Sequence, residues 1–315
     1  AEQDFGTNPC SEIILRSNQF CNLSEVVIRE KDTLASLKKK VETAAIIGTL
    51  QATLTDFRYL RNLWKRNTEE EALLGLSMTG IMDHPTLGNS SDKTKQWLEE
   101  LKEVAITTNK IWAEKLGIAQ SVAITCVKPS GTVSQLVDSA SGIHPRFSKQ
   151  YIRRVRSDKK DPLAVFMEDK GFPVEQDVMS PASAVFSFPV KAPEKSVTVA
   201  EVGAMQQLEL WKTYQNHWCE HKPSITVYYT DNEFLQVAQW IWDNFEICSG
   251  ISLLPVSDHV YQQAPYEDIS IEKYNELLAA MPQGVSWEDL ENFEQEDNTT
   301  GSQELACTGG ACEIV

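Results

Sequence analysis

Helical periodicity alternates with short apolar runs along this chain, and this alternation constrains the fold more than any other feature. Amphipathic spacing predicts helices over residues 33–55, 91–116, 201–217 and 231–244, the second capped by Ser91 or Asp92 and the fourth by Asp231. Short apolar runs predict strands or strand ends at residues 13–15, 26–28, 122–125 and 224–229. Helices that alternate with short buried strands indicate an α/β fold, in which a parallel sheet or barrel is the natural form.

Composition limits the ligands and partners of the chain. With 315 residues, 42% of them hydrophobic, the chain can bury the core of one large domain or two. Its 29 basic and 45 acidic residues give a net charge of −16, which argues against a nucleic-acid polymer as a general ligand. A small anionic substrate is compatible with this charge if backbone amides and a few cations bind it. No apolar run reaches the roughly 18–20 residues that cross a bilayer, so we expect no membrane partner.

The cysteines point to redox chemistry. Seven is an odd number and the spacing is irregular, which argues against a secreted disulfide framework and favours catalytic thiols in a reducing cytoplasm. Cys307 and Cys312 form a C-x4-C pair near the end of a polar tail, where a thiol pair is suited to thiol–disulfide exchange. The sequence therefore predicts an enzyme, or part of one, that consumes reducing equivalents.

A second pair of cysteines lies near the start, in N-P-C-S-E at 8–12 and at Cys21. A carboxylate two residues from the thiol of Cys10 suits a site where hydrogen and proton leave neighbouring atoms of one substrate. A capped turn with a half-buried cysteine explains N-P-C-S-E equally well, and Cys21 alone is typical of a buried strand cysteine. Cys126, Cys219 and Cys248 lack the spacing of a zinc site, so we predict no metal.

The segment that follows the predicted strand at 122–125 has the composition of an anion-binding turn. Free amides at a helix start, a glycine and several hydroxyls are suited to phosphate, while the spacing excludes a Walker A loop. An ordinary N-capped strand–helix connection is the alternative. The candidate phosphate-binding residues are Pro129, Ser130, Gly131, Thr132, Val133 and Ser134. Further along, Arg153-Arg154-Val155-Arg156 is interpreted as a solvated or partner-facing basic run.

Taken in order, N-P-C-x-E, the second cysteine, P-S-G-T-x-S and the terminal C-x4-C resemble the catalytic half of a ribonucleotide reductase large subunit. The eleven-residue step from Cys10 to Cys21, and proline after Asn8, are most similar to the adenosylcobalamin-dependent (class II) enzymes, especially the monomeric triphosphate type. The resemblance extends through S-G-I-H-P at 141–145 to Q-A-P-Y-E at 263–267.

The resemblance implies a fold. Residues 1–292 would form the C-terminal part of a ten-stranded α/β barrel with an inward finger loop, and residues 293–315 a flexible tail with a redox cysteine pair. Family members are about twice this long or more, and the chain starts at Ala1 directly before the first cysteine motif. We therefore expect the chain to be inactive without an N-terminal half, supplied as a separate chain or removed by processing.

The resemblance also implies roles for individual residues. Cys10 would become a thiyl radical and take the 3′-hydrogen of the ribose, with adenosylcobalamin as the cofactor. Glu12 would act as the base at the 3′-hydroxyl and Asn8 would orient the sugar hydroxyls. Cys21 would reduce the substrate together with a cysteine absent from this chain. The tail pair, Cys307 and Cys312, would reduce the resulting disulfide. The pair would then itself be reduced by thioredoxin or a similar protein.

Three other interpretations stay open. A class I reductase fragment, which depends on a separate metal-radical subunit, shares N-x-C-x-E and the terminal C-x4-C. A general thiol oxidoreductase would need a C-x-x-C at a helix N-terminus, and the sequence contains none. A noncatalytic scaffold leaves the terminal cysteines unexplained.

Overall fold

The computed structural model describes residues 4–256 and 262–295, and it divides the chain into two compact units. Unit 1 comprises residues 1–146 and 199–256, and unit 2 comprises residues 147–198 and 257–315. The expected tail at 293–315 lies almost entirely outside the described residues, so its boundary stays a prediction.

Unit 1 is built on parallel strand pairs. Strand β3 (Asn22–Val27) pairs with β4 (Leu74–Thr79), and β8 (Ile225–Tyr229) pairs with β9 (Ile251–Pro255), both in parallel. All six residues of β4 are buried, as the apolar run around it suggests, so this strand is covered on both faces.

A fifth parallel segment, residues 123–127, lies between the two pairs. It forms parallel bridges from Thr125 to Leu76 of β4 and from Val127 to Pro223, directly before β8. The strand predicted at 122–125 therefore overlaps this extended segment. The segment forms isolated bridges rather than a continuous ladder. Five parallel segments thus follow one another across unit 1, in the order in which they occur along the chain.

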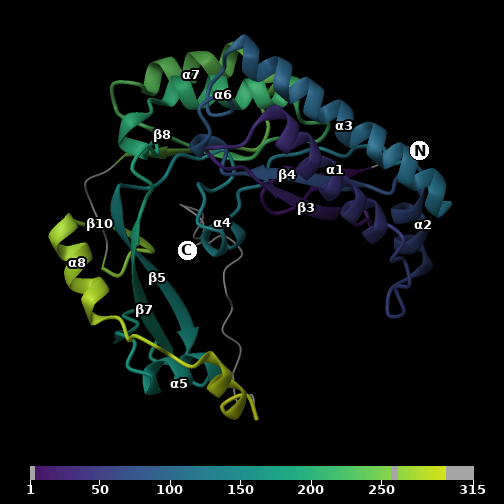
Figure 1. Ribbon diagram of the computed structural model, residues 1–315. Coiled ribbons are helices and arrows are strands. Elements are labelled where there is room, and N and C mark those ends of the chain that lie inside the picture. The colour runs from purple at the N-terminus through teal and green to yellow at the C-terminus, as the bar shows by residue number, and fades with distance from the viewer. Residues whose placement is uncertain (1–3, 257–261, 296–315) are drawn as a thin grey trace. The chain divides into compact units, whose positions relative to one another are not determined.

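Helices connect these segments, mostly as the periodicity predicts. They are α1 (Leu34–Gln51), α2 (Asn62–Glu71), α3 (Asp92–Leu116), α6 (Ala204–His217) and α7 (Phe234–Asp243), with the shorter turns η1 (Ile81–Asp83), α4 (Val133–Leu136), η2 (Val199–Glu201) and η3 (Phe245–Ile247). Figure 1 shows α1 and α3 running along the same side of β3 and β4. Gly48 of α1 packs on Leu74, where a Cβ would stand 3.3 Å from a leucine methyl, so this helix approaches the sheet closely.

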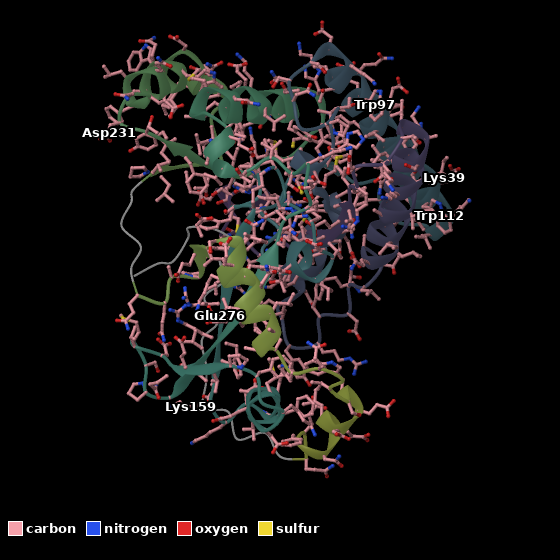
Figure 2. All side chains as sticks on the ribbon, turned by 60° about the vertical axis from the view of Figure 1, so that its left-hand side comes forward. Lys39, Trp97, Trp112, Lys159, Asp231 and Glu276 are labelled. Carbon is pink, nitrogen blue, oxygen red and sulfur yellow. The ribbon has the colours of Figure 1, made fainter. Side chains whose placement is uncertain are left out.

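The outward faces of α1 and α3 carry both charged and aromatic side chains. In Figure 2, Lys39 of α1 and Trp112 of α3 lie at the outer side of their helices. The Trp112 ring is covered by the Lys115 ammonium, which lies 4.7 Å from the ring centroid.

The caps refine two predicted helix limits. Ser91 is the N-cap of α3 and its side chain accepts a hydrogen bond from the amide of Thr94, as expected. Helix α7 begins at Phe234 rather than near Asp231, because the Glu233 carboxylate instead accepts hydrogen bonds from the amides of Thr230 and Ala204. These bonds hold residues 231–233 in a turn ahead of the helix.

Unit 2 is an antiparallel sheet with helices, in a region where the sequence shows only a mixed pattern. Its strands are β5 (Gln150–Asp158), β6 (Val174–Gln176), β7 (Ser183–Lys191) and β10 (Tyr266–Asp268), in the order β10-β5-β7-β6. Its helices are α5 (Pro162–Asp169), α8 (Ile271–Ala280) and the turn η4 (Trp287–Asn292). Phe166 and Phe186 lie in its core, and Phe293 packs edge-on against Phe166 with 5.4 Å between ring centroids.

Arg153 in the basic run on β5 is buried and its neighbouring arginines are partly buried, so the solvated alternative is wrong, while the partner-facing alternative stays a prediction. The Arg153 guanidinium is buried and lies 4.7 Å from the centroid of the Tyr266 ring. Arg154 forms an ion pair with Glu267, and Arg156 forms one with Asp177 at 3.3 Å. Carboxylates distant in the sequence supply these partners, which is why the local pattern does not reveal them.

The described residues confirm an α/β fold. They contain small sheets and bridges but no closed barrel, so the ten-stranded form is not established by this structure. Within 4–256 and 262–295, every helix is too short or too polar to cross a membrane.

Candidate active site

Cys10 lies at the tip of a hairpin. Strands β1 (Phe5–Thr7) and β2 (Ile14–Arg16) pair antiparallel, and residues 8–13 connect them. The amide of Ser11 donates to the carbonyl of Asn8 at 3.0 Å, which closes a turn with Pro9 at its second position, where proline is favoured. Cys10 is half-buried at the third position, so the sequence folds locally to present this thiol.

The Asn8 side chain is fixed by two hydrogen bonds. Its Nδ2 donates to Glu12 Oε1 at 2.6 Å, and its Oδ1 accepts from the amide of Ile13 at 3.1 Å. These bonds orient the amide group and connect the start of the turn to the carboxylate that follows it.

Glu12 is the most enclosed group of the site. Its side chain is 0% exposed, and Oε1 also accepts from Lys128 Nζ at 3.0 Å. The other oxygen, Oε2, is buried and has no hydrogen-bond partner among the described residues. A buried carboxylate oxygen without a donor is costly, and such groups are typical of catalytic positions.

Cys21 precedes β3 directly and is close to Glu12. Burial, and secondarily the negative charge of Glu12, raise the pKa of the Cys21 thiol from 9.0 to about 12. Its Sγ lies over Gly75, 3.3 Å from the place where a Cβ would stand, so glycine makes room for the sulfur. Cys126, on the middle parallel segment, is fully buried, and burial raises its pKa, with Cys219, Cys21 and Glu12 adding to the effect.

The raised pKa of Cys21 predicts slow alkylation. A shift of about three units leaves roughly 10³-fold less thiolate near pH 8, and only the thiolate reacts readily with iodoacetamide. We therefore expect Cys21 in the folded chain to react about 10³-fold more slowly than in the urea-unfolded chain, as measured by mass spectrometry of Cys21 peptides. In Glu12→Gln the folded rate should rise, because one of the two causes is removed. Equal rates in the folded and unfolded chain would contradict the assigned environment.

The candidate phosphate loop is internally bonded. Ser130 Oγ donates to Glu25 Oε2 at 2.9 Å and accepts from the amide of Ser134 at 3.2 Å, while Ser134 Oγ donates to the Ser130 carbonyl. Both serines are buried. For the amides of residues 131–133, the described part of the chain offers no hydrogen bond, and Thr132 and Val133 are exposed. The backbone amides, rather than the serine hydroxyls, are therefore the groups that face outward.

Two ionisable residues next to the site have no role predicted from the sequence. Lys128 contacts Glu12, and Glu25 of β3 contacts Ser130. Burial raises the pKa of Glu25, while Ser130 and Lys128 oppose this rise. Both residues lie on parallel segments whose carboxyl ends meet at one edge, which is the signal that could have indicated them.

The structure leaves part of the expected site untested. Cys307 and Cys312 lie outside the described residues. Where the chain is described, none of the five cysteines forms a disulfide, and no cluster of three or more His, Cys, Asp or Glu side chains is arranged to bind a metal.

Several known proteins with sequences similar to this chain carry the same name. Proteins named adenosylcobalamin-dependent ribonucleoside-triphosphate reductase match it from Lactobacillus helveticus, at 28% identity over 98% of this chain and 45% of the relative, and from Euglena gracilis, at 30% identity over 89% and 38%. A crystal structure of a B12-dependent (class II) ribonucleotide reductase matches with a TM-score of 0.74 and 24% identity, over 92% of this chain and 44% of that one. No family model matches the sequence.

The chain thus spans less than half the length of the relatives it matches, while they cover almost all of it. The similarity in sequence runs along 98% of the chain and the similarity in fold along 92%. The chain is therefore similar, along nearly its whole length, to proteins named adenosylcobalamin-dependent ribonucleoside-triphosphate reductase, and its fold is similar to that of a class II ribonucleotide reductase.

Proposed function

We propose that this chain is the C-terminal catalytic part of a reductase that converts ribonucleotides, as triphosphates, to 2′-deoxyribonucleotides with adenosylcobalamin as cofactor. The observation that carries this proposal is the arrangement of the hairpin: a half-buried Cys10 at the tip, with Asn8 bonded to a buried Glu12. The printed names of the relatives support the reaction and the cofactor. The thiol chemistry suits a reducing cytoplasm.

The thiol of Cys10 is the group of this site on which the cofactor would act. When bound, adenosylcobalamin supplies an organic radical that can oxidise a nearby thiol. Cys10 is the residue that would be oxidised, because it lies half-buried at the hairpin tip, two residues from the buried Glu12. The thiyl radical of Cys10 would then take the 3′-hydrogen of the ribose.

The residues next to Cys10 would accept the substrate proton and supply the reducing hydrogen. Glu12 accepts the proton of the 3′-hydroxyl at Oε2, the oxygen without a partner, and Asn8 orients the sugar hydroxyls. The high pKa of Cys21 keeps this group a protonated thiol at neutral pH, which is the form that can donate hydrogen to the substrate. Its partner thiol would come from the N-terminal half.

The larger fold and the tail are part of the same proposal. The five parallel segments of unit 1 would belong to a ten-stranded α/β barrel completed by the N-terminal half, with the hairpin projecting inward. Residues 293–315 would be a flexible tail on which Cys307 and Cys312 carry electrons from thioredoxin or a similar protein to the active-site disulfide.

Substrate phosphates would bind at residues 129–134. The amides of residues 131–133 are donors that need no cation, which suits a chain with a net charge of −16. Pro129 and the bonds of Ser130 and Ser134 within the loop would hold these amides in place.

Cofactor dependence tests the proposal. We expect the chain, combined with its N-terminal half, to reduce ribonucleoside triphosphates only when adenosylcobalamin and a dithiol are added, as measured by deoxynucleotide formation. Activity that ignores adenosylcobalamin and requires a di-iron or manganese subunit would show a class I enzyme instead. No reduction of any ribonucleotide under either condition would refute the function.

A further inference from the structure

The two oxygens of the Glu12 carboxylate have unequal surroundings. Oε1 accepts from Asn8 Nδ2 at 2.6 Å and from Lys128 Nζ at 3.0 Å. Oε2 is buried and has no donor among the described residues. The lone pairs of one oxygen are therefore occupied, while those of the other have no donor among the described residues.

Lys128 is held in place by elements far from Glu12 in the sequence. Its backbone amide donates to Ser77 Oγ of β4 at 2.8 Å. Its carbonyl lies only 2.5 Å from where a Cβ of Gly142 would stand, a contact that glycine alone allows. The lysine leaves the end of the middle parallel segment with its backbone fixed on both sides, and its side chain is 34% exposed.

Lys128 provides the positive charge for Glu12. No other ammonium or guanidinium of the described chain forms an ion pair with this carboxylate. Burial lowers the pKa of Lys128, but the charge and hydrogen bond of Glu12, together with Cys10 and Cys126, raise it further, so the net shift is upward from 10.5. On the alkaline side, the pair is therefore lost only as the pH rises through the folded pKa of Lys128, which lies above 10.5.

Other titratable groups face this pair from each neighbouring element. Cys10 lies on the same hairpin, Cys21 and Glu25 lie at β3, Cys126 precedes Lys128, and His221 precedes β8. Burial lowers the pKa of His221, and burial raises that of both Cys21 and Cys126, so these three are neutral at neutral pH. None of the three can replace the ammonium as counter-ion.

We propose that Lys128 is the positioning residue of the catalytic base: it binds Oε1 of Glu12, fixes the orientation of this carboxylate, and leaves Oε2 as the single oxygen that accepts the proton of the substrate hydroxyl. In this step the O–H bond of the substrate breaks and an O–H bond forms at Oε2, while Lys128 keeps its own protons. The inference rests on the proposed function, because it assigns Lys128 a part in that reaction.

The first experiment measures kcat and KM of the chain assembled with its N-terminal half. In Lys128→Met we expect kcat to fall about 10²-fold and KM for the nucleotide to change little, because the carboxylate loses the contact that orients it. Lys128→Arg keeps a cation that can bind Oε1 and should restore part of kcat.

A matched control is Lys38→Met, which removes the Lys38–Glu100 ion pair between α1 and α3, where Lys38 is exposed to a similar extent. This variant should leave kcat and KM unchanged. If Lys128→Met keeps the wild-type kcat, or if Lys38→Met lowers kcat as much, the inference is overturned.

The second experiment needs no activity. The free energies of unfolding of Lys128→Met, Glu12→Gln and the double variant of this chain form a thermodynamic cycle. We expect the loss in the double variant to be smaller than the two single losses combined, because either change alone breaks the same buried pair. Strict additivity would contradict the pairing even in an active reductase. If Lys128 and Glu12 are coupled but the assembled protein has no reductase activity, the pairing stands and the proposed function is refuted.

Discussion

Cys10→Ser, assembled with the N-terminal half, is expected to form no deoxynucleotide even in a first turnover. Hydrogen abstraction by the proposed mechanism needs a radical on the side chain at the hairpin tip, and the O–H bond of serine is too strong to be converted readily into one. We expect a loss of at least about 10³-fold in rate, equivalent to about 4 kcal/mol of activation free energy. Single-turnover assays with pre-reduced protein measure this directly.

The control for this variant is Cys248→Ser. Cys248 is half-buried between η3 and β9, and the site residues described above do not contact it. The same chemical change there should leave the first turnover intact. Product formed by Cys10→Ser at more than about one hundredth of the wild-type rate would mean that Cys10 does not carry the radical.

Gly142→Ala is expected to be a strongly destabilising single-methyl change near the site. Gly142 has φ +54°, and an added Cβ would meet the Lys128 carbonyl at 2.5 Å. The left-handed backbone costs about 1–2 kcal/mol for alanine, and the forced backbone shift costs about 1–3 kcal/mol more. A loss of about 2–5 kcal/mol in the free energy of unfolding should be found by urea titration.

Gly117→Ala separates these two costs. Gly117 ends α3 with φ +68°, and nothing lies within 4 Å of its Cβ position, so only the backbone cost of about 1–2 kcal/mol applies. Equal losses in the two variants would show that the carbonyl of Lys128 can move away freely. In that case Gly142 would not fix the lysine that contacts Glu12.

The turn chemistry of the hairpin is a local property, and the sequence by itself determines it. Asparagine, proline and cysteine at 8–10 favour a turn that presents the cysteine, because proline fixes φ at the second position. The helices follow in the same way from periodicity and caps, as in α3 with Ser91. These features depend on neighbours within a few residues, so they could be predicted without coordinates.

The antiparallel sheet of unit 2 could not be predicted in this way. Its strands pair over long sequence separations, as β5 does with β10, and the carboxylates that partner its arginines come from those other strands. The exact start of α7 was also set from outside, by the bonds of Glu233 to Thr230 and Ala204. Long-range pairing leaves little local signal because the paired strands lie far apart in the sequence.

The sequence by itself determined the α/β class and the residues that resemble a reductase site. Only the tertiary structure decided the surroundings of these residues: the burial of Glu12, its free oxygen Oε2, and the Lys128 ammonium on Oε1. Lys128 is 116 residues from Glu12, and parallel segments joined by helices bring the two together. The energy of an ion pair depends on distance and on exclusion of water, and neither quantity is fixed until separate segments pack.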